Sequence, residues 1–271
     1  MKTLQNYITE KILIHKNSKI VYNYYPKTKN ELKDIIKQRI ESEGNDCNLN
    51  DIDTSNITDM SYLFLKSDFN GDISNWNVSN VTNMEGMFYS SKFNGDISNW
   101  NISNVEDMSD MFYGSKFNGD ISKWNVLNVT NMKYMFMNSK FDGDISNWNV
   151  SNVEDMHNMF SRSTFNGDIS NWDVSNVKNM EYMFSGSKFN GDISKWNVSN
   201  VKSMEYMFLG SNFNADISKW NVSNIENMAG MFESSKFNND ISNWDVSNVT
   251  NNIDMFVDCP IEEKYRPKFN D

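Results

Sequence analysis

Proline and cysteine are scarce in this 271-residue chain, which contains three prolines and two cysteines. The cysteines, Cys47 and Cys259, lie far apart in the sequence, and a disulfide joins only Cα atoms about 4.4–6.8 Å apart. If the residues between them form an elongated stack of strands about 4.8 Å apart, the two thiols cannot bond. Unpaired thiols fit a reducing compartment or a protein indifferent to redox state. Neither cysteine has the neighbours that a metal site needs, and we expect no cofactor.

Long hydrophobic runs are also missing. No apolar segment approaches the roughly 20 residues of a membrane-spanning helix, so we expect no insertion into a bilayer. The first residues, "MKTLQNYITEKILIHKNSKI", interrupt their apolar side chains with Gln, Asn, Glu and Lys, which is unlike a Sec-type signal. We therefore expect a cytoplasmic or phage-associated protein, or one that reaches a surface by another route.

Positive charge is in short supply, since the formal net charge is −11. Such an excess of acid argues against a nucleic-acid partner. Residues 1–50 carry nine basic and six acidic side chains, whereas the rest of the chain carries 16 basic and 30 acidic ones. This asymmetry indicates two parts with different surfaces.

What the chain has in abundance is repetition with a period of 24 residues. The eight tryptophans follow this period: Trp76, Trp100, Trp124, Trp148, Trp172, Trp196, Trp220 and Trp244. Met-Phe pairs recur in the same way, from Met87-Phe88 to Met255-Phe256. The segment 51–64 fits the pattern with Ile52 in place of tryptophan, as expected of a divergent terminal copy.

One copy, "DISNWNVSNVTNMEGMFYSSKFNG", combines two kinds of apolar spacing. Trp76 and Val78 alternate with a polar residue, which predicts a strand. From Val81 the spacing becomes three, which favours a helical or 3₁₀ turn. A single copy is too small to fold alone, so the copies must stack and share their faces. The pattern thus predicts an α/β solenoid of 24-residue repeats with a parallel sheet.

The frame I-x-x-W-x-V-x-x-V-x-x-M-x-x-M-F resembles a leucine-rich repeat. More specifically, "DISNWNVSNVTNMEGMF" resembles the mycoplasma-type repeat of the BspA-like leucine-rich-repeat surface proteins of bacteria, over about residues 51–258. This resemblance implies a right-handed, curved solenoid and a non-catalytic binding or surface role. It names no ligand.

The predicted organisation has three parts: a capping or attachment segment (1–50), the solenoid (51–258) and a C-terminal cap (259–271). The first part is expected to contain a helix over 3–14, a strand over 19–25 and a helix over 28–43. The last of these has a Thr28/Glu31 capping box and a glycine stop at Gly44. The segment either covers the open edge of the first repeat or docks its basic helix on an acidic partner.

The first candidate site is the outward face of the predicted sheet, which would offer repeated donors and acceptors to a glycan or an extended protein. Its central positions are Asn77, Asn101, Asn125, Asn149, Asp173, Asn197, Asn221 and Asp245. The alternative is that these residues form ladders that only stabilise the sheet. A second row, from Asp72 to Asp240, either binds Ca²⁺ or caps turns; we favour the turns and predict no metal.

Variation between copies concentrates after the methionine positions, on the flanking helical surface of the predicted repeat. It is either drift at exposed positions or an aromatic-aliphatic patch for a protein partner. The patch would contain Tyr134, Met137, Tyr182, Tyr206 and Leu209. The tryptophan and methionine rows are predicted to be core.

Enzyme chemistry has little support, because the sequence contains no nucleophile–base pair, phosphate loop or metal-ligand spacing. We predict a non-catalytic scaffold that recognises a protein or a repetitive glycan, with possible self-association through the solenoid ends. The alternative is a structural part or spacer of a larger assembly, such as a surface layer or phage particle, attached through residues 1–50. N-x-S/T sequons inside the packed repeats argue against a eukaryotic secretory route and favour a bacterial or phage origin.

Overall fold

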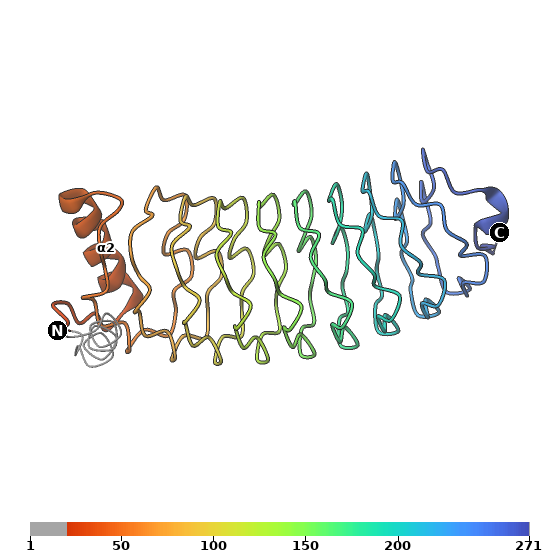
Figure 1. Ribbon diagram of the computed structural model, residues 1–271. Coiled ribbons are helices and arrows are strands. Elements are labelled where there is room, and N and C mark those ends of the chain that lie inside the picture. The colour runs from red at the N-terminus through yellow and green to blue at the C-terminus, as the bar shows by residue number, and fades with distance from the viewer. Residues whose placement is uncertain (1–20, 271) are drawn as a thin grey trace, which may run out of the picture.

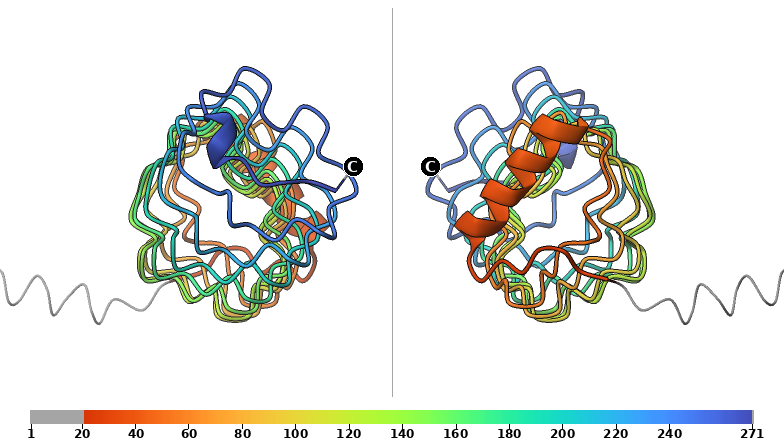
Figure 2. Two further views of the ribbon diagram at one scale, coloured as in Figure 1. Left: turned by 90° about the vertical axis from the view of Figure 1, so that its right-hand side faces the viewer. Right: turned by 90° about the vertical axis from the view of Figure 1, so that its left-hand side faces the viewer.

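The computed structural model describes residues 21–270, so the helix expected over 3–14 lies outside the described part. Helix α2 (Lys29–Glu43) lies at one end of a row of stacked coils, and the 3₁₀ helix η1 (Glu263–Tyr265) lies at the other (Figure 1). Viewed along the row, the coils have similar outlines and are gradually offset from one end of the stack to the other (Figure 2). The protein is a repeat structure in which each 24-residue copy forms one coil.

The predicted α/β fold with a parallel sheet, as in a leucine-rich repeat, is wrong. No strand occurs among residues 21–270. Neighbouring copies are joined instead by isolated parallel bridges between equivalent residues, in a series that runs from Asp59↔Asn83 to Asn227↔Asn251. The segment expected as a strand over 19–25 contributes one such bridge, Tyr24↔Ile52.

Strands are missing because the chain turns every few residues. The apolar residues three apart are the two ends of β-turns, in which the last N–H donates to the first carbonyl. These turns join Ile73 to Trp76 (3.1 Å), Val78 to Val81 (3.0 Å) and Met84 to Met87 (3.2 Å). The expected helical turn over Val81–Phe88 is therefore also wrong. Each turn directs its apolar ends inward, and its two middle residues lie on the outer side of the coil, where those of the Met84–Met87 turn are mostly half-buried or buried.

Two residues of each coil have a left-handed backbone. They occupy the positions of Gly86 (φ 56°) and Ser90 (φ 51°) in all nine copies from Tyr62 to Asp258. A positive φ at the third residue of a turn is the mark of a type II turn. It reverses the direction of the next peptide group, so that every second N–H points along the stack.

These alternate N–H groups form four columns of hydrogen bonds, which we call the peptide columns. In each column the N–H of one copy donates to the carbonyl 23 residues later, as from Gly86 to Ser109 (2.8 Å) and from Phe88 to Met111 (2.9 Å). Each column contains eight such bonds and runs from the first coil to the last. The wall that carries the columns holds neighbouring coils at a fixed spacing.

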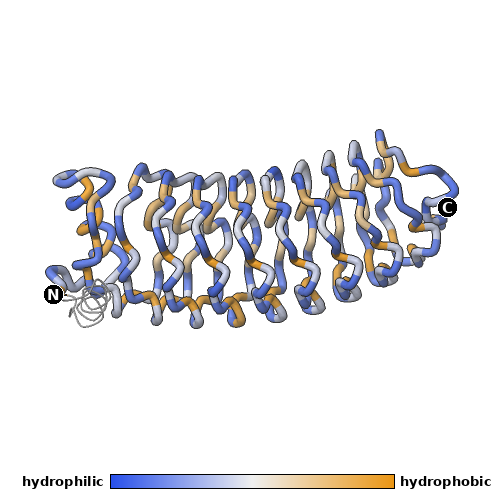
Figure 3. The backbone as a smooth tube through the Cα atoms, in the orientation of Figure 1, coloured by the Kyte–Doolittle hydropathy of each residue, from blue (hydrophilic) through white to orange (hydrophobic). Residues whose placement is uncertain are grey.

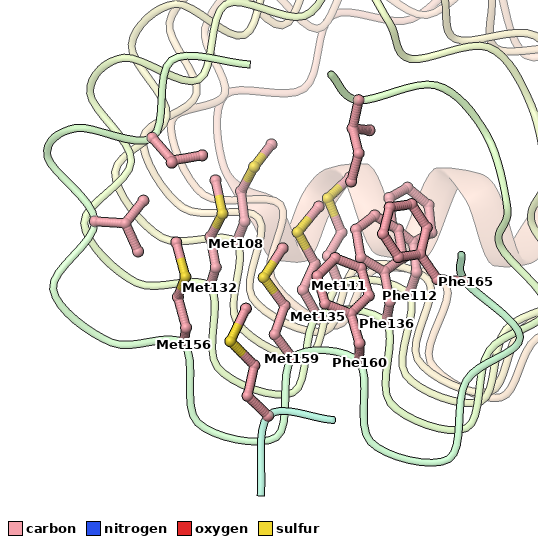
Figure 4. Close-up of a cluster of buried hydrophobic side chains, with 14 of the residues drawn as sticks. Met108, Met111, Phe112, Met132, Met135, Phe136, Met156, Met159, Phe160 and Phe165 are labelled. Carbon is pink, nitrogen blue, oxygen red and sulfur yellow. The ribbon is translucent and has the colours of Figure 1, made fainter. Parts of the chain in front are cut away.

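The core is a set of stacked rows of identical side chains, which confirms the predicted tryptophan and methionine core. Every tryptophan is at least 95% buried, and the methionine and phenylalanine rows are almost fully buried. Equivalent rings lie parallel, with Phe88 and Phe112 centroids 5.7 Å apart at an interplanar angle of 5°. Figure 4 shows the methionine rows beside the phenylalanines, and Figure 3 shows the apolar residues recurring at the same place in each coil.

Helix α2 covers the first end of the stack, as the right-hand view of Figure 2 shows. The predicted N-cap and glycine stop are confirmed: Thr28 accepts from the Glu31 N–H, and Gly44 ends the helix at φ 91°. The capping box is not closed as predicted, because the Glu31 carboxylate accepts from the Lys27 N–H (2.7 Å) instead of the Thr28 N–H. Leu32 and Ile36 are buried against the core. Arg39 binds Glu43 and also Asp51 of the first coil at 2.8 Å, and the pKa of its guanidinium is raised by these carboxylates, chiefly Glu43.

The other end is covered only in part. The Ile241 N–H donates to the carbonyl of Tyr265 in η1 (3.0 Å), and Ile261 is buried. Cys259 lies in this part of the chain and Cys47 at the opposite end, and both are free thiols.

Side chains clamp neighbouring coils at two further places. Each indole N–H donates to a backbone carbonyl 27 residues earlier, as from Trp148 to Ile121 (3.1 Å). Each asparagine at the Asn80 position, from Asn80 to Asn248, donates its amide to a carbonyl 25 residues earlier, as from Asn152 to Leu127 (2.9 Å). This second bond needs a donor, which explains why asparagine recurs there in these eight copies.

The Asn77 position needs a hydrogen-bond acceptor, whereas the Asn80 position needs a donor, and this difference gives a test. Asn149 uses only its oxygen, which accepts from the Ser151 N–H (3.1 Å), and Asp173 and Asp245 take the same role in other copies. We expect Asn152→Asp to lower the free energy of unfolding by about 1–2 kcal/mol, because a carboxylate replaces the donor. Asn149→Asp should change it by less than about 0.5 kcal/mol. Equal losses in denaturant titrations would contradict the clamp.

Candidate functional site

The wall that carries the peptide columns also carries most of the variation between copies. Residues at the Glu85 and Gly86 positions lie on its outer surface, half-buried or exposed in most copies. In the middle of the stack, these two positions bring together Tyr134, His157, Tyr182 and Tyr206, which we call the tyrosine strip. It contains three of the five residues predicted for an aromatic-aliphatic patch.

Rings of the tyrosine strip contact one another from copy to copy. The His157 ring lies edge-on to Tyr134 (centroids 5.0 Å apart) and to Tyr182 (5.9 Å). Tyr182 stacks on Tyr206 at 5.0 Å with an interplanar angle of 28°. The strip is therefore a continuous row of rings across four copies.

His157 is the polar centre of the strip. Its Nε2 lies 2.8 Å from the Tyr134 hydroxyl and 2.8 Å from the Asn158 amide nitrogen. Its Nδ1 is buried and lies 3.4 Å from a carboxylate oxygen of Glu181, without hydrogen-bond geometry. His157 was not among the predicted site residues. Its period-24 neighbours, Lys133 and Glu181, were the available signal.

The tyrosine strip is surrounded by carboxylates and is partly buried from solvent. Burial, followed by the carboxylates of Asp110 and Asp155, raises the pKa of the Tyr134 hydroxyl. Burial and Glu205 raise the pKa of Tyr182 in the same way. Just before the strip, burial and then the Glu85 carboxylate raise the pKa of Asp110 to about 6.

Met137 and Leu209 are not brought together with the strip. Both are half-buried and occupy the Tyr89 position, which lies on a neighbouring row of the same wall. Two copies lie between them, and Ser161 and Ser185 occupy the intervening places. The surface on which all five residues lie is made of turns, so its expected helical character is wrong.

The asparagine face, which is the predicted site formed by the Asn77 position of each copy, is also not part of a sheet. Its residues Asn77, Asn101, Asn125, Asn149, Asp173, Asn197, Asn221 and Asp245 are all exposed. Each side-chain oxygen accepts from the N–H two residues later, as Asn77 does from Ser79 (3.1 Å), which is an Asx-turn. The row is thus a series of local turn caps with free amide or carboxylate atoms, and its use as a binding face stays a prediction.

The aspartate row has the same local role. Each oxygen accepts from a serine N–H two residues later, as in Asp144 to Ser146 (2.9 Å). These bonds lower the pKa of the Asp144 carboxyl. Within residues 21–270, no group of three or more His, Cys, Asp or Glu residues is placed to hold a metal ion.

A family model described as "Mycoplasma protein of unknown function, DUF285" matches residues 31–140, 115–211 and 188–265. The chain belongs to this family. The match supports the mycoplasma-type repeat seen in the sequence, but not the finer BspA-like, leucine-rich-repeat assignment. No curated protein and no solved structure matches this DUF285 chain at the significance required. In the part of it that the structure describes, no helix is long and apolar enough to span a bilayer.

The tyrosines of the DUF285 chain constrain the glycines beside them. A Cβ at Gly230 (φ 58°) would overlap the Tyr206 ring, whereas a Cβ at Gly210 (φ 60°) has no heavy atom within 4 Å. Both substitutions to alanine incur the left-handed backbone cost of about 1 kcal/mol. Gly230→Ala should therefore lower the melting temperature clearly more than Gly210→Ala. In a background that also carries Tyr206→Asn, this additional destabilisation by Gly230→Ala should disappear. Equal shifts for both glycines would show that the ring does not pack there.

A second prediction concerns Asp110. The unfolded carboxyl has a pKa near 3.9 and the folded one about 6, so folded protein binds the proton more tightly between these values. The protonated Asp110 carboxyl therefore makes its whole contribution to stability below about pH 4, and this contribution is lost as the pH rises through 6. Asp110→Asn should stabilise the protein by about 1 kcal/mol at pH 7.5, allowing for partial exposure, and by little at pH 4.

Melting temperatures at the two pH values would test this. Asp254→Asn is the matched control, because Asp254 holds the same position in the last copy and is exposed, with a similar φ of 57°. A stabilisation of Asp110→Asn that is equal at both pH values, or equal to that of the control, would contradict the prediction.

Proposed function

We propose that this protein is a non-catalytic repeat scaffold that recognises a protein partner through the tyrosine strip. The observation that carries this proposal is the presence of tyrosine at a backbone position to which it is poorly suited. At the left-handed Gly86 position, five copies carry Gly, Asn or Asp, which tolerate a positive φ. The other four copies carry tyrosine: Tyr62, Tyr134, Tyr182 and Tyr206.

A left-handed conformation costs a residue with a Cβ about 1–2 kcal/mol. Tyr62 has a structural compensation, since its hydroxyl donates to Glu85 at 2.7 Å. Tyr182 and Tyr206 make no such side-chain hydrogen bond within residues 21–270, although they stack on each other at 5.0 Å. Their retention at this position is best explained by a use for the rings on the surface.

The strip has the properties of an anchor for a protein. Packed tyrosines lose little side-chain entropy on binding, and they are enriched among the residues that dominate binding energy. Carboxylates of Asp155, Glu181 and Glu205 lie along the strip. An acidic, aromatic row favours a partner that offers arginine or lysine side chains, which can lie over ring faces and pair with carboxylates.

The test uses Tyr182→Asn/Tyr206→Asn, because asparagine suits the left-handed backbone and should preserve the stack. Wild type and variant would be used to capture proteins from lysate and surface fractions of the source organism, followed by measurement of Kd for each captured protein. We expect at least a tenfold weaker Kd for the variant, with unchanged circular dichroism.

The matched control is Asn197→Ser/Asn221→Ser, which alters the asparagine face in two adjacent copies, as the tyrosine variant does in its own row. It should bind the captured protein like the wild type. Loss of binding in this control but not in the tyrosine variant would move recognition to the asparagine face and overturn the proposal.

A further inference from the structure

Exposed apolar side chains gather at the two ends of the stack. Among residues 21–270, the large exposed ones are Val21, Tyr25, Leu65, Leu127, Ile253 and Val257. Only Leu127 lies in the interior of the array. Ile253 is 68% exposed and Val257 is 43% exposed on the last coil, and Leu65 is 45% exposed on the first. Scattered surface hydrophobics are ordinary, but apolar side chains beside unpaired backbone groups on an open edge favour pairing with another chain.

The last coil ends the peptide columns with unused donors. Its carbonyls accept from the preceding copy, as Ile253 does from Gly230 (2.8 Å). The backbone N–H groups of Asn252, Asp254, Phe256 and Asp258 have no acceptor among the described residues. In every earlier copy, the equivalent four groups donate to the next coil. Residues 252–258, which we call the donor edge, thus present a row of donors beside exposed Ile253 and Val257.

The first coil ends the same columns with unused acceptors. Within the described range 21–270, no group donates to the backbone carbonyls of Asp59, Ser61, Leu63 or Leu65. Lys29 of α2 lies at the Asp59 end, where its ammonium contacts the carboxylate at 3.2 Å and also the Ser61 hydroxyl. This contact satisfies the side chains at that end of the row, and leaves the carbonyls of Leu63 and Leu65 for another donor.

A groove of about 530 Å³ lies beside those two carbonyls, between α2 and the first coil. Its apolar lining comes from Ile36 and Ile40 of the helix and from Leu63, Phe64 and Leu65 of the coil. Lys33 and Lys37, with Asp34 and Glu41, line its helical side. The donor edge itself carries two exposed carboxylates, Asp254 and Asp258, and the nearby basic group is Arg266, which lies over the Phe256 ring at 5.1 Å.

We propose that the occupant of this groove is the donor edge of a second copy of this chain. Ile253 and Val257 of one molecule then pack against Ile36, Ile40 and Leu65 of the next. Phe256 and Asp258 N–H groups face the carbonyls of Leu63 and Leu65, which hold the equivalent places in the columns. Lysines of α2 face Asp254 and Asp258.

This contact joins unlike ends, so each molecule keeps one free end of each kind and the assembly is open. The proposed contact uses few residues on each molecule, far fewer than the roughly 20–30 on each side of a stable interface. Association is therefore weak in dilute solution and grows with local concentration. The tyrosine strip, on the side wall, stays exposed in such a row.

The test is sedimentation velocity of the full chain over a concentration series up to about 1 mM. Three variants use serine, which occurs naturally at the same repeat positions in Ser109 and Ser161. Ile253→Ser/Val257→Ser disables the donor edge and Leu65→Ser disables the groove. Leu127→Ser, in the middle of the array, is the control, and Ser79 and Ser103 hold its repeat position in other copies.

We expect wild type and Leu127→Ser to form a concentration-dependent series of oligomers, and each end variant to associate at least about tenfold more weakly. A mixture of the two end variants should stop at one-to-one dimers, because each retains one intact end. A wild type that stays monomeric over the whole series would overturn the proposal. So would a mixture that associates no better than its separate components.

Discussion

Hydrogen bonds between alternate backbone N–H groups and carbonyls of the next copy are the constraint on which the whole molecule depends. They require two left-handed residues in each coil, at the positions of Gly86 and Ser90. They also require every copy to have the same length, because one inserted residue would shift each donor away from its carbonyl. The strict 24-residue spacing of tryptophan, methionine and phenylalanine is the visible result in the sequence.

The repeat, its period, the buried rows and helix α2 were predictable from the sequence, whereas the local backbone was not. Apolar residues three apart, such as Met84 and Met87, occur at the ends of a β-turn as readily as on one side of a helix. Trp76 and Val78 alternate as in a strand, yet turns at 73–76 and 78–81 enclose them. Left-handed positions are hard to recognise because tyrosine, lysine and serine share them with glycine.

The candidate site was predictable only in outline. Variable positions pointed to one wall of the stack, and Tyr134, Tyr182 and Tyr206 lie on it. The ring of His157 connects Tyr134 to Tyr182, and this contact depends on the directions of the side chains, which cannot be deduced from the repeat spacing. Met137 and Leu209 shared the same degree of variation but lie on another row, separated by two serines. Asn80 and Asn77 looked alike in the sequence, although one must donate to a neighbouring coil and the other needs only to accept within its own.

The peptide columns also give the molecule an electrical direction. Each peptide group has a dipole of about 3.5 D, and groups aligned head to tail add their dipoles, as in an α-helix. Strands in ordinary sheets largely cancel this effect because their dipoles alternate. Four columns of eight bonds point the same way here, and they outnumber two series of opposite direction, which begin with the bonds from the Thr82 N–H to the Thr58 carbonyl and from the Lys92 N–H to the Ser67 carbonyl. The net dipole therefore has its positive pole at the C-terminal coil and its negative pole under the lysines of α2. Near a charged surface, the long axis of this protein therefore has a preferred orientation, with one pole inward.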